Sequence, residues 1–248
     1  MSNFKTVMKR YGKRLTPRQW RLFACACVRR VTETTRGSNG AAIDLAERFA
    51  DGQATTHQLA SSRFAGRFQS GNAAWAVCWD PAEDARGMAE RASAWAAGLL
   101  GEVHGTNLPR RERTIDFELF HEIANHLIEP AHIDPLWLAW NDGTVRQLAE
   151  TIYDERSWDQ MPILGDALED AGCQDERILG HCRRGGPHVR GCWLLDLILP
   201  LVTDTPRAPA RRHRAPRPPR PARRPCGRPR RGCGTGRPLR GSSPRRRS

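Results

Sequence analysis

Cysteine and histidine side chains gather in one short segment near residue 180. The segment holds the five residues Cys173, His181, Cys182, His188 and Cys192. Thiolates and imidazoles are ligands that zinc prefers, so this cluster is the candidate metal site, either structural or part of a metal-dependent or acid–base enzyme. The spacing is irregular and lacks a Cys-x-x-Cys pair, and Cys182 shares a helical stripe with Ile178 and Leu179. This pattern favours plain burial of the thiols in a core.

Two further motifs resemble metal or disulfide sites but have the wrong spacing. The string H-E-I-A-N-H at 121–126 lacks the second histidine of the zinc motif H-E-x-x-H, because Asn125 stands at i+4 and His126 lies about 140° round the helix from His121. Cys25 and Cys27 are two residues apart, which places them on opposite sides of a helix. We therefore predict neither a zinc hydrolase site nor a shared metal or disulfide.

Charged residues around the same region invite an acid–base mechanism. They are Asp142, Asp154, Glu155, Arg156, Asp159 and Asp166. Such charges at the ends of short helices usually cap them or form ion pairs, and this is our interpretation. We expect His188, Arg190 and Asp196 to form a buried polar network around Gly185 and Gly186 that specifies the fold. No catalytic and no cofactor-binding residue is predicted.

Helical spacing of apolar residues predicts the elements that position the cluster. Four short helices are expected at 145–153, 163–171, 178–182 and 189–199. Asp142 or Thr144 can cap the first of them, Pro162 and Gly172 bound the second, and Asp175 caps the third. Pro200 ends the fourth. The segment 130–141, with two prolines and two tryptophans, is expected to be an ordered, extended connection.

The N-terminal half has the same character. Thr16 and Gln19 form a capping box that opens a helix running to about residue 34. Further helices are expected at 42–50, 55–68, 80–99 and 115–127. We predict an all-α fold, an irregular multi-helix bundle with lobes at 16–100 and 114–202, a linker at 101–113 and a solvated basic arm at 1–15. The eight tryptophans are expected mostly in the core or between helices.

The net charge of +13 does not describe the body of the chain, because it comes from the C-terminal tail. Residues 203–248 carry sixteen arginines and a single acid, Asp204, which gives +15 and leaves −2 for residues 1–202. This tail is rich in Pro and Gly and poor in apolar residues, so we expect it to be disordered. It resembles a GC-rich reading frame entered after a frameshift. The alternatives are a nucleic-acid-binding tail, although aromatics for stacking on bases are missing, and an inert extension.

Several strings match a family pattern. They are RLFACAC at 21–27, W-x-x-W-N-D-G-T-V at 137–145, I-Y-D-E-R at 152–156, P-I-L-x-D-A-L-E-x-A-G-C at 162–173, I-L-x-H-C-R at 178–183 and G-x-H-V-R-G-C-W-x-x-D-L at 186–197. Together they resemble a domain that recurs in paralogous planctomycete proteins, over about residues 15–199. No activity is attached to that family, so the resemblance implies a fold and no site. Residues 122–130 depart from the family's D-I-F-G-N-P-F-R-P.

The apolar segments of the sequence bear on where the protein is located and what it does. The basic N-terminus is not followed by an apolar segment, so no secretory signal is predicted. The apolar run 193–202 is interrupted by Asp196 and Pro200 and is too short to cross a bilayer. We expect a cytoplasmic protein with reduced thiols. The leading hypothesis is a non-enzymatic helical module that binds a partner protein or an adjacent domain. We expect no contact with a membrane. Nucleic acid is a partner only if residues 203–248 are a genuine part of the protein and not the product of a frameshift.

Overall fold

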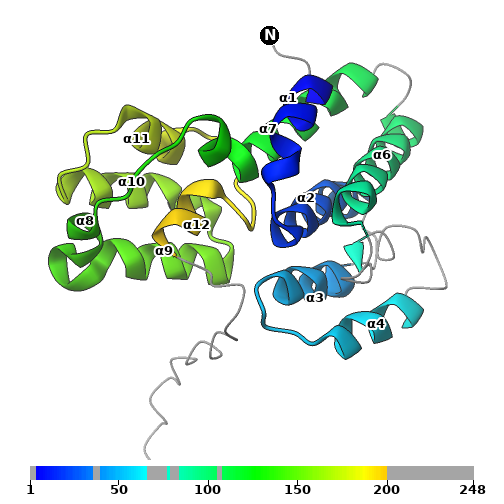
Figure 1. The fold of residues 1–248 in the computed structure, drawn as a ribbon, viewed down its shortest axis with the longest axis horizontal. Coiled ribbons are helices and arrows are strands. Elements are labelled where there is room, and N and C mark those ends of the chain that lie inside the picture. Colours follow the sequence, from blue (N-terminus) through cyan, green and yellow to red (C-terminus); the bar gives the residue numbers. More distant parts are fainter. Residues whose placement is uncertain (1–3, 36–39, 66–76, 79–83, 105–107, 200–248) are drawn as a thin grey trace, which may run out of the picture. The chain divides into compact units, whose positions relative to one another are not determined.

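The structure is a computed structural model that describes residues 4–35, 40–65, 77–78, 84–104 and 108–199. Every regular element within these ranges is a helix, which confirms the all-α prediction (Figure 1). The predicted disordered tail, 203–248, lies outside the described residues.

The helices begin and end at the following residues. They are α1 (Phe4–Tyr11), η1 (Gly12–Arg14), α2 (Pro17–Thr35), α3 (Gly40–Ala50), α4 (Thr56–Ala65), α6 (Ala85–His104), α7 (Leu108–Ile128), α8 (Pro135–Ala139), η2 (Trp140–Gly143), α9 (Thr144–Glu155), η3 (Trp158–Gln160), α10 (Met161–Asp170), α11 (Glu176–Arg183) and α12 (Trp193–Ile198).

Helix α2 is the centre of the first hydrophobic cluster. It starts at the predicted capping box, in which the Thr16 N–H donates to Gln19 Oε1 at 3.0 Å and the Gln19 N–H donates to Thr16 Oγ1 at 3.2 Å. Residues 19–28 are all buried, because α2 packs against α3, α6 and α7. A helix that is covered on several sides can carry the nearly continuous apolar run seen in this sequence.

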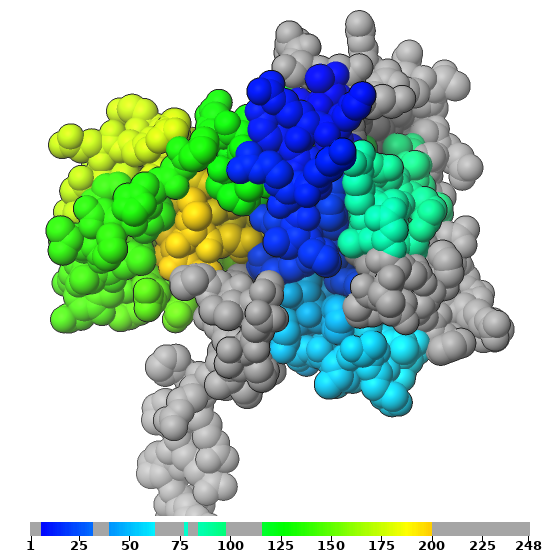
Figure 2. Space-filling view, in the orientation of Figure 1, coloured from blue at the N-terminus to red at the C-terminus, as the bar shows by residue number. Residues whose placement is uncertain are grey.

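The second hydrophobic cluster comprises α9 to α12. Helices α10 and α11 lie very close together: a Cβ atom built on Gly165 would stand 2.8 Å from Cys182 Cβ, so only glycine fits there. Helix α12 contacts both α9 and α7. In the space-filling view its gold atoms lie between the green helices and the blue N-terminal residues (Figure 2). This element therefore connects the two clusters.

Three predicted segments differ in the structure. The basic arm at 1–15 is helical from Phe4, and Val7 and Met8 are buried in the first cluster, because the segment has a short apolar stripe among its lysines. The extended connection at 130–141 contains the short helix α8, which Asp134 caps by accepting from the Leu136 N–H at 2.8 Å. The last helix is shorter than predicted, because Gly191 takes a φ of +88° that no helix accommodates.

The lobe boundary also differs. The predicted linker 101–113 is helical in its described part, since α6 extends to His104 and α7 begins at Leu108 with Pro109 in its first turn, where no N–H is needed. The buried residues of α7 that the structure describes, among them Phe120 and Ile123, lie in the first cluster and not with α9 to α12. The clusters thus separate between α7 and α9, where α8 and η2 form the connection.

The predicted caps are found at α10 and α11 but not at the start of α9. Asp175 caps α11 by accepting from the Arg177 N–H at 2.9 Å, and Gly172 takes a φ of +97° after α10, as predicted. Neither Asp142 nor Thr144 caps α9: its N-cap is Gly143, which has no side chain to offer. Asp142 is itself in the left-handed region, so its backbone turns away from the helix start.

Candidate functional site

Four buried side chains from distant parts of the sequence converge. Glu122 comes from α7, His181 from α11, and His188 and Cys192 from the connection between α11 and α12. One potential ligand atom from each lies within 4.8 Å of all the others. No member of the group is more than 8% exposed. We call these four residues the EHHC cluster.

Local structure brings these residues together. Between α11 and α12 the chain makes tight turns, with hydrogen bonds from the Gly186 N–H to the Arg184 carbonyl (2.7 Å) and from the Cys192 N–H to the Val189 carbonyl (3.0 Å). Gly191 then presses against α2, where an added Cβ would lie 2.9 Å from Leu22 Cδ1. This close approach directs His188 and Cys192 toward α7.

Hydrogen bonds connect the four side chains. His188 Nδ1 lies 2.9 Å from Glu122 Oε1, and His181 Nε2 lies 3.2 Å from Cys192 Sγ and 3.6 Å from the same Glu122 oxygen. The Trp193 indole N–H donates to His181 Nδ1 at 3.2 Å. Because an indole nitrogen can only donate, the proton of a neutral His181 is on Nε2 and faces Glu122 and Cys192.

Burial sets the protonation of this cluster. It lowers the pKa of His181 to about 4, and the nearby Glu122 carboxylate only partly offsets that effect. Burial also raises the pKa of the Cys192 thiol well above its usual value. At neutral pH and without a metal, the cluster therefore holds a neutral imidazole and a protonated thiol. A coordinated cation would have the opposite effect on the Cys192 thiol, because a thiol that binds a metal loses its proton.

The structure divides the five residues of the predicted metal cluster. His181, His188 and Cys192 meet, whereas Cys173 and Cys182 are buried in the second hydrophobic cluster outside the EHHC group. Burial raises the pKa of both of these thiols, to about 12 for Cys182. Plain burial is thus the observed state of these two cysteines.

Glu122 is the member that sequence reasoning did not assign. It lies within the H-E-x-x-N-H string, but it pairs with His188, 66 positions away, and not with either histidine of that string. A detectable sign was present: Glu122 stands between Phe120 and Ile123 of a buried helix stripe. A carboxylate in such a position is rarely buried without a partner.

Cys25 and Cys27 are both free and fully buried in α2. The Cys27 thiol lies 3.8 Å from an Asp116 carboxylate oxygen. Burial raises the pKa of each thiol, and neither belongs to a group of potential metal ligands among the described residues.

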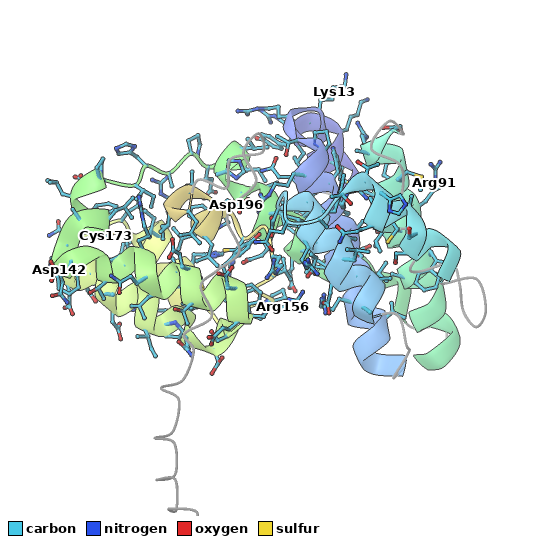
Figure 3. All side chains as sticks on the ribbon, turned by 90° about the horizontal axis from the view of Figure 1, so that it is seen from below. Lys13, Arg91, Asp142, Arg156, Cys173 and Asp196 are labelled. Atoms are coloured by element: carbon cyan, nitrogen blue, oxygen red, sulfur yellow. The ribbon has the colours of Figure 1, made fainter. Side chains whose placement is uncertain are left out.

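The charged residues considered for acid–base chemistry do not converge. Asp142 and Arg156 lie at opposite ends of α9 (Figure 3). Arg156 forms ion pairs with Asp44 and Glu47 of α3, and Asp166 pairs with Arg183. These ion pairs match the predicted pairing role, whereas the predicted capping of α9 by Asp142 is not found.

The structure has two separate networks in place of the single one predicted for His188, Arg190 and Asp196. His188 belongs to the EHHC cluster, while Arg190 donates to Asp51 at 2.9 Å and Asp196 accepts from Arg18 at 2.5 Å. Arg18 also donates to Asp51. The second network joins α2 and the end of α3 to α12, because Arg18 lies in α2, Asp51 directly follows α3 and Asp196 lies in α12.

A surface pocket of about 450 Å³ lies between α8 and α9. It is lined by Pro135, Leu138, Ala139, Asp142, Gly143, Arg146, Gln147 and Glu150. At its edge, Asn141, Asp142 and Gly143 have φ angles of 47°, 56° and 82°. The Thr144 hydroxyl donates to the Asn141 carbonyl, and the Gln147 amide donates to the Asp142 carbonyl, which holds this left-handed turn in place. Nearby Leu136 is 75% exposed.

Comparison of the chain with protein families, with curated proteins and with solved structures gives no match.

Among the described helices, none combines the length and the apolar character that a bilayer crossing requires.

Proposed function

We propose that this chain is a non-enzymatic helical module that binds a partner protein at the pocket between α8 and α9. The observation that carries the proposal is the left-handed turn Asn141–Asp142–Gly143, which forms one edge of that pocket. Left-handed backbone costs a non-glycine residue up to about 1–2 kcal/mol, although asparagine and aspartate tolerate it best. Strain of this kind concentrates where a surface is shaped for binding.

The chemistry of the pocket suits a short segment of a partner protein. Leu138 and Ala139 supply apolar surface, and Asp142, Arg146 and Glu150 supply a net negative charge. A partner segment with one apolar and one basic side chain would complement both. The turn also lies within the W-x-x-W-N-D-G-T-V string on which the resemblance to the planctomycete domain rests, and we include membership of that family in the proposal.

An enzymatic role has less support. The EHHC cluster contains the chemistry that the enzyme alternative needs, but its most exposed member is only 8% accessible. A substrate must reach the reacting groups, whereas these groups face one another. The nucleic-acid alternative depends on the tail at 203–248, which the structure does not describe.

Affinity purification of the full chain from an extract of its source organism tests the proposal. Leu136→Asp alters an exposed position beside the pocket, and Asp142→Asn removes a negative charge from its lining; the first should abolish copurification of a stoichiometric partner and the second should weaken it. Ile163→Asp is the matched control, because Ile163 is 54% exposed on α10 and does not line the pocket. A partner retained by Leu136→Asp but lost by Ile163→Asp would place the binding surface elsewhere and contradict the proposal.

A further inference from the structure

We infer that the EHHC cluster is a structural zinc site, a role independent of the proposed partner binding. The cluster offers one carboxylate oxygen, two imidazole nitrogens and one sulfur from Glu122, His181, His188 and Cys192. Four protein ligands that leave no open position are typical of structural zinc sites. Nitrogen and sulfur donors select zinc over magnesium or calcium, which prefer oxygen.

Three of the six distances between ligand atoms are close to those of a loaded site, and all six are within 4.8 Å. A tetrahedral zinc with bonds of roughly 2.0–2.3 Å holds its ligand atoms about 3.3–3.8 Å apart. His181 Nε2 lies 3.2 Å from Cys192 Sγ and 3.6 Å from Glu122 Oε1, and His188 Nδ1 lies 2.9 Å from that oxygen. Only shifts of a few tenths of an ångström are needed for these three pairs.

Charge balance supports a divalent cation at this place. A Glu122 carboxylate and a Cys192 thiolate together neutralise Zn²⁺, and two neutral imidazoles complete the shell. The net charge is then zero, which limits the desolvation cost of burying the ion. Binding releases the thiol proton of Cys192 to solvent, as metal binding to cysteine requires.

Two contacts must change on loading. Zinc on Nε2 of His181 requires the proton of the neutral ring to move to Nδ1, which faces the Trp193 indole N–H at 3.2 Å and Arg184 Nη2 at 3.3 Å. Because the indole and the guanidinium can only donate, both of these hydrogen bonds are lost. Trp193 therefore reports metal binding through its fluorescence. Of the four ligands, His188 also lines a pocket of about 260 Å³, together with Pro187 and Val189.

The metal content of the purified full-length protein is the first test. Mass spectrometry of the metals should find one zinc per chain after dialysis against a weak chelator. After zinc removal, cobalt(II) alone should produce the thiolate charge-transfer band and the visible absorption of a tetrahedral site, and added zinc should abolish both. Zinc at a thousandfold excess over its Kd should raise the Tm by on the order of 10 °C.

Variants assign the signal to the cluster. Cys192→Ser should remove the cobalt charge-transfer band, and Glu122→Gln should weaken zinc binding by at least about 100-fold. Cys182→Ser is the matched control, because it changes another buried thiol that lies outside the cluster and should keep the band.

Two outcomes would overturn the inference. One is a wild-type protein without bound zinc, whose Tm does not respond to zinc and which gives no cobalt band. The other is a band that persists in Cys192→Ser. The wild-type measurements need no variant, so they give a result even where a substitution prevents folding. In either case the cluster would be a metal-free hydrogen-bonded network.

Discussion

The Tyr153 hydroxyl of α9 lies 3.0 Å from both carboxylate oxygens of Asp51, at the end of α3. The Asp51 side chain is fully buried. This contact joins the second hydrophobic cluster to the first, and Arg18 and Arg190 donate to the same carboxylate. Burial raises the pKa of Tyr153 well above 10, so the hydroxyl keeps the proton that it donates.

Removing the Tyr153 hydroxyl should measure the strength of this connection. Tyr153→Phe leaves the ring in place but deprives the buried Asp51 of a donor, so we expect the free energy of unfolding to fall by about 1–3 kcal/mol. Urea unfolding followed by tryptophan fluorescence measures the change. Tyr11→Phe, at the other and partly exposed tyrosine, should change stability by less than about 0.5 kcal/mol. Equal effects of the two substitutions would contradict this role for the Tyr153 hydroxyl.

Neutralising Asp51 should be more costly. Asp51→Asn removes the buried carboxylate charge that Arg18 and Arg190 share, and the side chains of these arginines are 8% and 9% exposed. Arg18 keeps its ion pair with Asp196, and Arg190 keeps a 3.9 Å contact with Glu47. Breaking a buried ion pair in this way costs about 3–5 kcal/mol. The control is Asp166→Asn, because that carboxylate is 70% exposed where it pairs with Arg183, and exposed pairs contribute no more than about 1 kcal/mol. A loss below about 1 kcal/mol for Asp51→Asn in urea unfolding would show that the network is not stabilising.

His126 should make stability depend on pH. Burial lowers its pKa below the usual 6.5. Between that lowered pKa and 6.5 the unfolded chain binds a proton that the folded chain does not, so the contribution of His126 to stability falls as pH decreases through 6.5. In His126→Gln, the free energy of unfolding should therefore change less with pH between about pH 7 and the lowered pKa. Titration of the His126 ring protons by NMR checks the cause, and a midpoint at or above 6.5 would contradict it.

Two glycines should respond to alanine in opposite directions. Gly191→Ala adds a Cβ at a φ of +88° and 2.9 Å from Leu22 Cδ1, so it should lower stability by at least about 1–3 kcal/mol. Gly180→Ala adds a methyl group at an exposed position of helix α11 with nothing within 4 Å, so it should raise stability by about 0.5–1 kcal/mol. Thermal unfolding of both variants compares them directly. A stabilised Gly191→Ala would mean that the connection to α12 is not held against α2.

Local patterns made much of the fold predictable. The capping box at Thr16 and Gln19, the cap at Asp175 and the left-handed Gly172 depend on neighbouring residues and are found as predicted. Contacts between distant residues were harder to foresee. The pairing of Glu122 with His188 requires α7 to meet the connection after α11, and no periodicity within either segment specifies that meeting.

The same limit explains the differences in the candidate site. Cys173 and His181 are near in sequence but diverge, because α11 places Cys173 before its first turn and His181 near its end. The left-handed turn at Asn141 and Asp142 could be suspected from the N-D-G string, since asparagine, aspartate and glycine tolerate that conformation. Its position at the edge of a pocket required the packing of α8 on α9.

The most direct test of the proposed binding role is photo-crosslinking from two surface positions. A photoreactive amino acid replaces either Leu136, beside the α8–α9 pocket, or Ile163, on α10, in the full chain within an extract of its source organism. We predict one crosslinked product of defined mass from position 136 and none from position 163. No product from position 136, or the same product at equal yield from both positions, would contradict binding at this pocket.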